Sequence, residues 1–439
     1  MAIDFPFLSF NLLIGIFQKV YCSPEECPAI RRVHLYAILY NLFSESAYYR
    51  LSDATKQARL RKYTDQCKRQ LEIAIGQLDI SISPTFQNTV ALLLAALYAV
   101  ESGQSRLCWA MNSQAAALCQ RLGYHRICTM LDDDEITRKS KINIFWSVYI
   151  LDKILSLRLG HASIIQDWDI SLPFFPDNIC VTNKRLDGKV TRGQAIIVYA
   201  IRIAQIQGQL YEKLFSPAAL SKSESERSTI AKQLLNALDQ AWIDRANISI
   251  LDLAAEKKHS FSFFYPEEPW DNDTSMLNEN QTPPGHVMLR GLNTIDELQH
   301  LEDLYHHRDA VVHHATRTLI QKAASYDSIT SSTQCLASAR KALAAHQRCS
   351  DKFNIDGVEQ LWPPCTSFIV IFWNTILTCD TADLSILSNL VTSLDTVRQN
   401  YNDLDQSYSM LALLLHIARL YVDAKQKGTP QIADISSSS

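Results

Sequence analysis

A run of histidines and carboxylates is the strongest candidate for chemistry in this 439-residue sequence. Its members recur at helical spacing: Glu297, His300, Asp303, His307 and His314. Carboxylate–histidine pairs three or four residues apart on a helix can share a metal ion. A two-metal bundle needs matching Glu-x-x-His pairs on other helices, and the sequence contains none. We therefore interpret the run as an ordinary helix, and a metal site is the less favoured alternative.

Three consecutive aspartates, Asp132 to Asp134, suggest a comparison with the magnesium-diphosphate sites of all-α isoprenoid synthases. Such a site needs carboxylates one helical turn apart, whereas Ile136 and Thr137 occupy the positions where the next acid should stand. Carboxylates also accept hydrogen bonds from the unpaired N–H groups at the start of a helix. We therefore predict that the triplet caps a long helix that ends at Gly160.

Enzyme and metal motifs are absent from the sequence. It contains no G-x-S-x-G, phosphate-binding glycine loop, dinucleotide fingerprint or H-E-x-x-H. Its 11 cysteines include no C-x2-C pair, which argues against a structural zinc site. Cys108, Cys119 and Cys128 lie in apolar helical patterns and are predicted to be buried, reduced thiols of an intracellular protein. No catalytic residue, cofactor-binding residue or metal ligand is predicted in this chain.

Composition predicts the fold class that must position these residues. Hydrophobic residues make up 47% of the chain, enough for a large core. The 12 Gly and 14 Pro together are about 6% of the chain, half the average share, which favours an all-α multi-helix array over turn-rich β structure. The formal charge of −4 argues against nucleic-acid binding by the chain alone. The basic stretch Lys56 to Arg69 is interpreted as a solvated helix face, with an acidic-partner or nucleic-acid surface as the alternative.

Hydrophobic periodicity divides the chain into five segments. We predict an N-terminal helical part (1–87), a core helical region (88–264), a flexible acidic and proline-rich loop (265–290), a C-terminal helical part (291–428) and a disordered tail (429–439). The apolar segment Phe5 to Phe17 is too short to span a bilayer and is predicted to be a core helix. No heptad run is long enough to predict a coiled coil.

The stretch Ile142 to Phe175, INIFWSVYILDKILSLRLGHASIIQDWDISLPFF, carries a recognisable pattern. An aromatic pair precedes Y-x-x-D-K, then L-S-L-x-x-G, and finally D-I-x-x-P. This pattern resembles the regulatory middle region of fungal transcription factors that carry an N-terminal binuclear zinc cluster. The resemblance extends from Leu92 to Val422 and implies a structural or regulatory role for its signature residues. They are Trp146, Tyr149, Asp152, Lys153, Ser156, Leu157, Gly160, Ser163, Asp169 and Pro173.

The spacing of these residues also has a physical interpretation. Trp146, Tyr149, Lys153 and Leu157 fall at i, i+3, i+7 and i+11, which forms one aromatic and apolar stripe on a helix. We expect Asp152 and Lys153 to form ion pairs with neighbouring helices. Nothing in the pattern acts on a substrate, so the stripe is interpreted as part of a scaffold.

Two departures from the family pattern limit what the resemblance implies. The family's Arg-Pro after the glycine is His161-Ala162 here, and the six-cysteine zinc cluster with its basic linker and coiled coil is missing. The chain is therefore expected to be either a fragment of a longer zinc-cluster protein or a stand-alone co-regulator. Zinc belongs only to that missing cluster, and DNA is contacted through it or through a partner.

The resemblance implies a nuclear, non-catalytic regulator of RNA polymerase II transcription, with secondary metabolism or nutrient use as candidate processes. It would act through other transcription-regulatory proteins or a small-molecule effector, with no membrane involvement. Two alternatives stay open. One is an all-α enzyme of secondary metabolism with an apolar pocket, and the other is a helical protein that serves only for interaction.

Overall fold

The computed structural model describes residues 15, 17–18, 27–49, 54–79, 81–172, 192–246, 295–324, 332–353, 364–397 and 402–428. All regular secondary structure within these ranges is helical, which confirms the predicted all-α array. The predicted flexible loop 265–290, the tail 429–439 and signature residue Pro173 lie outside the described residues. So does most of the predicted helix Phe5 to Phe17.

The helices fall into two compact units, each described by itself. The first unit comprises Met1–Val100, Ser105–Glu212 and Asp239–Glu302, and the second comprises Glu101–Gln104, Lys213–Leu238 and Asp303–Ser439. The described helices up to residue 210 are α2 (Ala29–Tyr49), α3 (Ala54–Gly76), α4 (Phe86–Glu101), α5 (Ser105–Arg121), η2 (Ile127–Met130), α6 (Glu135–Leu159), η3 (Asp167–Asp169) and α7 (Arg192–Leu210). Those that follow are η4 (Tyr211–Phe215), α8 (Pro217–Leu220), α9 (Glu224–Ala246), α12 (Ile295–Ala324), α13 (Thr333–Phe353), α14 (Cys365–Thr378), α15 (Thr381–Val397) and α16 (Asn402–Gly428).

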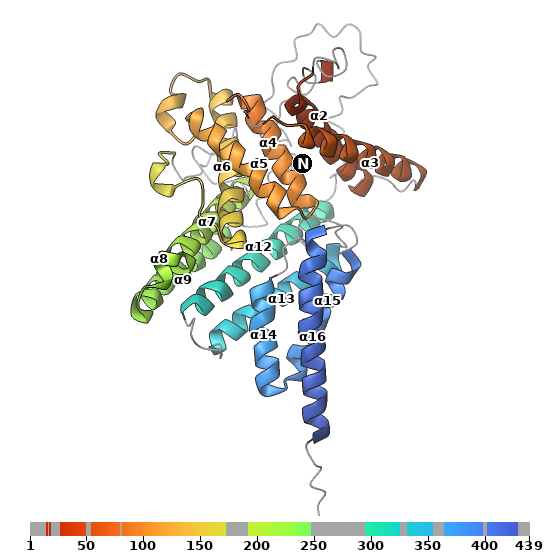
Figure 1. Cartoon of the computed structure of the whole chain (residues 1–439), viewed down its shortest axis with the longest axis vertical. Helices are drawn as coiled ribbons and strands as arrows, with labels where there is room; N and C mark the ends of the chain where they lie inside the picture. Colours follow the sequence, from red (N-terminus) through yellow and green to blue (C-terminus); the bar gives the residue numbers. More distant parts are fainter. Residues whose placement is uncertain are drawn as a thin grey trace, which may run out of the picture. The chain divides into compact units, whose positions relative to one another are not determined.

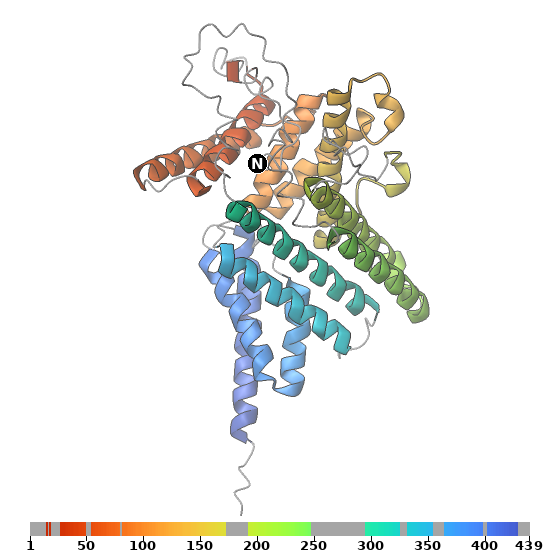
Figure 2. The ribbon, with the colours of Figure 1, turned by 180° about the vertical axis from the view of Figure 1, so that it is seen from behind.

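Helix α4 is strongly apolar, and its residues from Thr89 to Ala96 are all buried. Tyr98 on the same helix donates a 2.6 Å hydrogen bond from its hydroxyl to Glu72 of α3 and meets the ring of Tyr40 of α2 edge-on. Helices α2 and α3 lie side by side as a hairpin in both views (Figures 1 and 2). Burial of apolar surface from several helices thus holds α4 inside the unit.

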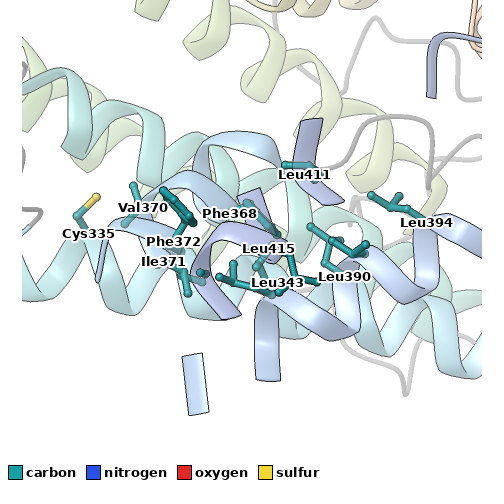
Figure 3. Packing of buried hydrophobic residues seen from close by; sticks show 14 residues of the cluster. Cys335, Leu343, Phe368, Val370, Ile371, Phe372, Leu390, Leu394, Leu411 and Leu415 are labelled. Atoms are coloured by element: carbon teal, nitrogen blue, oxygen red, sulfur yellow. The ribbon is translucent and has the colours of Figure 1, made fainter. Parts of the chain in front are cut away.

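The second unit has a core of its own, built from α13, α14, α15 and α16. Figure 3 shows side chains from all four helices meeting there, among them Leu343, Phe368, Leu390 and Leu415. At the edge of this core, Arg340 donates two hydrogen bonds to the buried Asp383, at 2.7 and 2.9 Å. This two-point contact ties α13 to the first turn of α15.

Helix α6 begins and ends where the sequence predicts. Asp134 is its N-cap and accepts a 2.9 Å hydrogen bond from the backbone N–H of Thr137. Gly160 ends it at φ 69°, in the left-handed region that glycine adopts without steric strain. The capping interpretation of the aspartate triplet is confirmed for Asp134.

One predicted core residue is on the surface. Cys108 and Cys119 are buried as expected, but Cys128 is exposed. The chain turns at Gly123, with φ 76°, and Cys128 then lies in the short helix η2 and not in the continuing α-helical period. The prediction that Cys128 is buried was therefore wrong, because a 3.6-residue repeat does not extend through that turn.

Candidate functional site: the signature cluster on α6

Asp152 organises the loop that follows α6, called here the signature loop (residues 161–172). The Asp152 side chain is buried, with a residue exposure of 3%. Its carboxylate accepts hydrogen bonds from the Ser163 hydroxyl at 2.6 Å, the Ile164 N–H at 3.1 Å and the Ile165 N–H at 2.9 Å. Charge-assisted bonds of this kind are among the stronger ones in proteins. Asp152 therefore fixes the course of the signature loop.

Lys153 holds the same loop from the next position on α6. Its ammonium group donates to the carbonyl oxygen of Ile165 at 2.7 Å and pairs with Asp167 at 2.8 Å. It also lies 5.1 Å from the centre of the Tyr149 ring, within the range of a cation–π contact. Because the lysine is almost fully buried, these partners stabilise a charge that water does not reach.

Aromatic rings form the base of the cluster. Trp146 and Tyr149 are both buried and pack edge to face, with ring centres 5.2 Å apart. The Tyr149 hydroxyl donates a 2.9 Å hydrogen bond to Asp167. Burial, and secondarily the charge of Asp167, raises the pKa of Tyr149 well above its usual value. Tyr149 is therefore a neutral hydrogen-bond donor at any physiological pH.

A second set of contacts attaches the far end of the signature loop to the segment after α5. Asp169 pairs with Arg126 at 2.7 Å and lies 3.4 Å from His125. The Arg126 guanidinium lowers the pKa of the Asp169 carboxyl. Ser171 continues the contact, since its N–H donates to the His125 carbonyl at 3.0 Å and its hydroxyl accepts from the Ile127 N–H at 3.1 Å. The loop is thus anchored at both ends.

Ser156 and Gly160, two further signature residues, shape the turn between helix and loop. The Ser156 hydroxyl donates to the His161 carbonyl at 2.5 Å, and the N–H groups of Gly160 and His161 both bond the Ser156 carbonyl. The Gly160 carbonyl in turn accepts a 3.1 Å bond from the Tyr211 hydroxyl. Leu157 is half-buried on the same helix. Nine of the ten predicted signature residues therefore lie on α6 or its loop, and Pro173 is outside the described residues.

The predicted partners of Asp152 and Lys153 are found only in part. Lys153 pairs with Asp167 of the short helix η3, whereas the Asp152 carboxylate bonds to groups of the signature loop and to no neighbouring helix in the described contacts. The loop's buried N–H and carbonyl groups need partners, because an unsatisfied buried polar group is costly. Asp152 and Lys153, in the C-terminal half of α6, satisfy these groups of the loop.

The arrangement is suited to holding a loop in place, because the charged and hydroxyl groups of α6 bond to the loop. In the described part of the chain, no three His, Cys, Asp or Glu side chains are placed to hold a metal ion. The side chains of the candidates Glu297, His300 and Asp303 lie outside the described residues. Burial raises the pKa of the nearby Cys108 thiol to about 12, which disfavours the reactive thiolate. The polar groups of the cluster bond to one another.

Trp168 of the signature loop is not among the site residues predicted from the sequence. Trp168 lies between the two paired aspartates, yet its side chain is exposed, with a residue exposure of 83%. An apolar residue inside a buried-looking motif is normally expected to point inward. No periodicity could show otherwise, because η3 is a single turn whose orientation depends on the contacts of Asp167 and Asp169.

Comparison with known proteins agrees with this geometry. Residues 41–243, which include α6 and the whole signature loop, match the model of the fungal-specific transcription factor domain. The match ends at residue 243, whereas the resemblance inferred from sequence extended to Val422. No solved structure matches the chain.

Several curated relatives are transcription regulators by name. An uncharacterized transcriptional regulatory protein of Schizosaccharomyces pombe is 30% identical over 144 residues, which are 33% of this chain and 22% of that protein. The transcriptional activator protein acu-15 of Neurospora crassa is 25% identical over 223 residues, 49% of this chain and 23% of that protein. The negative regulator of pleiotropic drug resistance STB5 of Candida glabrata is 24% identical over 216 residues, 48% of this chain and 20% of that protein. The chain thus matches about a fifth of each relative's length.

Proposed function

Because residues 41–243 form a fungal-specific transcription factor domain, we propose that this chain regulates transcription and does so without catalysis. The observation that carries the proposal is the signature cluster, in which the family-pattern residues Asp152, Lys153, Ser163 and Asp169 hold one loop. Similarity to relatives named as transcriptional regulators supports it. One relative is named an activator and another a negative regulator, so the sign of regulation is not assigned.

The proposed site of action is the nucleus, and the process is transcription by RNA polymerase II. Helix surfaces and the signature loop would contact other regulatory proteins or a small effector. DNA contact and zinc belong to a six-cysteine cluster outside these 439 residues or on a partner. The residues present do not fit such a cluster, because no two cysteines are separated by two residues. No described helix is long and apolar enough to cross a membrane.

Trp168 is the proposed contact residue for a regulatory protein. Tryptophan is enriched among residues that dominate binding energy at protein interfaces. Its loop is held by Asp152 and Lys153 beneath it and by Asp169 beside it, so little conformational entropy is lost when a partner covers the indole. A rigid loop with one large exposed aromatic side chain fits this role.

The test is to tether the whole chain to an unrelated DNA-binding module upstream of a reporter gene in fungal cells. The expected result is a change in reporter output, in either direction, relative to the module alone. Equal output from the tethered chain and the module, at equal protein levels, contradicts the transcriptional role. Trp168→Ala should reduce the effect while Leu131→Ala, which truncates another highly exposed side chain, should not. If Trp168→Ala keeps the full effect on reporter output, the proposed contact through Trp168 is contradicted, whereas the transcriptional role is not.

A further inference from the structure

Helix α3 is strongly basic in a chain that is slightly acidic as a whole. It contains six Lys and Arg residues and two acids, whereas the whole chain has 42 Lys and Arg residues against 46 Asp and Glu. Four of its cations are exposed to solvent: Arg59, Arg61, Lys62 and Arg69. Positive charge concentrated on one element of an acidic chain marks that element as a candidate binding surface.

Two of the basic residues lie on a flank of α3 where acids offset them. Asp65 follows Arg61 by four residues, and Glu72 follows Lys68 by the same interval. Residues four apart are neighbours on a helix surface, so opposite charges at this spacing attract each other. This set of four residues, called here the mixed flank, has no net charge and does not call for a charged partner.

The other exposed cations form a face of their own. Arg59, Lys62 and Arg69 stand at i, i+3 and i+10, which places them on one side of the helix. The neutral Gln66 and Gln70 share this side, and all five side chains are exposed. In the part of the chain that the structure describes, none of the three cations forms an ion pair. Their positive charge is therefore available to a partner.

Apolar side chains accompany these cations. Tyr63 is 41% exposed and leans against Phe43 of α2, with ring centres 5.4 Å apart, and Ile73 is 51% exposed. The rise of an α-helix separates Tyr63 and Ile73 by about 15 Å along α3. The basic face is defined here as Arg59, Lys62, Tyr63, Gln66, Arg69, Gln70 and Ile73. It offers three cations and two apolar contacts over about four helical turns.

This combination favours one class of partner. Complementary charge requires an anionic surface. Nucleic acids bind by having many phosphates neutralised, so three cations provide only a weak site, and phosphates carry no apolar group to cover Tyr63 and Ile73. An acidic protein segment supplies carboxylates, which pair well with Arg and Lys, together with apolar side chains in the same span. The basic face therefore matches a protein better than a nucleic acid.

We propose that the basic face of α3 binds an acidic segment of another protein. Its carboxylates pair with Arg59, Lys62 and Arg69, and its apolar side chains cover Tyr63 and Ile73. This surface is separate from the signature loop and its Trp168. The inference concerns a second contact of the chain and does not depend on the proposed transcriptional role.

The first test measures binding of a fluorescein-labelled helical peptide with glutamates and leucines on one face, by fluorescence anisotropy with the full 439-residue chain. The same peptide with every glutamate replaced by glutamine is the probe control. We expect the acidic peptide alone to bind, and its affinity to fall as salt is added. Lys62→Gln with Arg69→Gln should raise its dissociation constant at least about fivefold.

The matched control variant carries Arg61→Gln with Lys68→Gln. It removes one arginine and one lysine from the same helix, so the net charge of the chain changes equally, but both changes lie on the mixed flank. Its dissociation constant should stay close to that of the wild type. Circular dichroism and thermal melting establish that both double variants are folded.

The second test addresses the apolar part of the contact. Ile73→Ala should weaken binding of the acidic peptide several-fold, because the peptide's leucines lose apolar surface to cover. Ile243→Ala on α9 is the control, since Ile243 has the same exposure of 51% and lies outside the basic face. Equal affinities of these two variants would overturn the apolar contact.

Three outcomes would overturn the proposal as a whole. The first is equal binding of the acidic and glutamine peptides, or binding of neither. The second is equal loss of affinity in the two double variants, since the effect would then be one of net charge. The third is tighter binding of duplex DNA or of phosphatidylserine vesicles than of the acidic peptide, with loss in Lys62→Gln/Arg69→Gln, which would assign the face to another class of partner.

Discussion

Gly208 on α7 lies directly against the side chain of Lys153 on α6. A Cβ atom at Gly208 would stand 2.6 Å from Lys153 Cδ and 3.3 Å from its Cε, closer than carbon atoms approach without repulsion. The missing side chain at 208 lets the lysine pass α7 and reach Ile165 and Asp167 of the signature loop. A residue on another helix therefore determines whether the signature lysine can bind its partners.

The contact predicts that Gly208→Ala destabilises the protein. The added methyl group would push Lys153 out of its position, and overpacking of this kind costs about 1–3 kcal/mol. That loss exceeds the gain of up to about 1 kcal/mol that alanine brings to a helix interior. Urea unfolding measures the difference. Gly76→Ala on α3, where a Cβ meets no atom within 4 Å, is the control and should be neutral or stabilising.

Asp152→Ala should loosen the signature loop. The substitution leaves the N–H groups of Ile164 and Ile165 and the Ser163 hydroxyl without the carboxylate that accepts their hydrogen bonds, at an expected cost of about 3 kcal/mol in unfolding free energy. Hydrogen exchange of these two amides should accelerate. Asp132→Ala, at an exposed position of the same acidic triplet, should change stability by less than about 0.5 kcal/mol. Unchanged exchange in Asp152→Ala would contradict the anchoring role.

Buried His346 makes stability depend on pH. The residue is 2% exposed, neither ring nitrogen has a hydrogen-bond partner in the described ranges, and burial lowers the pKa of His346 to about 4. Between pH 6.5 and pH 4 the unfolded chain binds a proton there that the folded chain does not, so stability falls as pH falls. His346 contributes a slope of about 1.4 kcal/mol per pH unit in this window.

His346→Leu should remove that share of the slope. Chemical unfolding at several pH values from 6.5 to 4 measures it in both proteins. Gln347→Leu, which changes a neutral neighbour on α13, should keep the wild-type slope. Identical slopes for His346→Leu and the wild type would show that His346 is protonated equally in the folded and unfolded chain.

The thiols should differ sharply in reactivity. Cys128 is exposed, whereas Cys108 and Cys119 are fully buried, and burial raises the pKa of both buried thiols. A maleimide reagent at neutral pH should therefore label Cys128 in the native protein and reach Cys108 and Cys119 only after unfolding. Peptide mass spectrometry after a short exposure measures the order. Equal labelling of all three in the native protein would contradict the structure.

The sequence by itself determined the local features of this protein. The cap at Asp134 and the turn at Gly160 follow from residue types and spacing within one helix length, and the structure confirms both. The grouping of the signature residues was also visible, because they lie within about 30 positions of one another. Such features depend on backbone geometry that repeats every few residues.

Only the tertiary structure decided the partners and the exposed faces. The approach of Gly208 to Lys153, the turn of Asp152 toward the signature loop and the outward position of Trp168 depend on elements distant in sequence. Helix α16 carries apolar side chains on two of its faces, so its sequence does not show which face is buried. Packing covers Leu411 and Leu415 and leaves Leu413 and Ile417 exposed. The physical reason is that periodicity specifies which residues share a face, whereas burial depends on which neighbour covers that face.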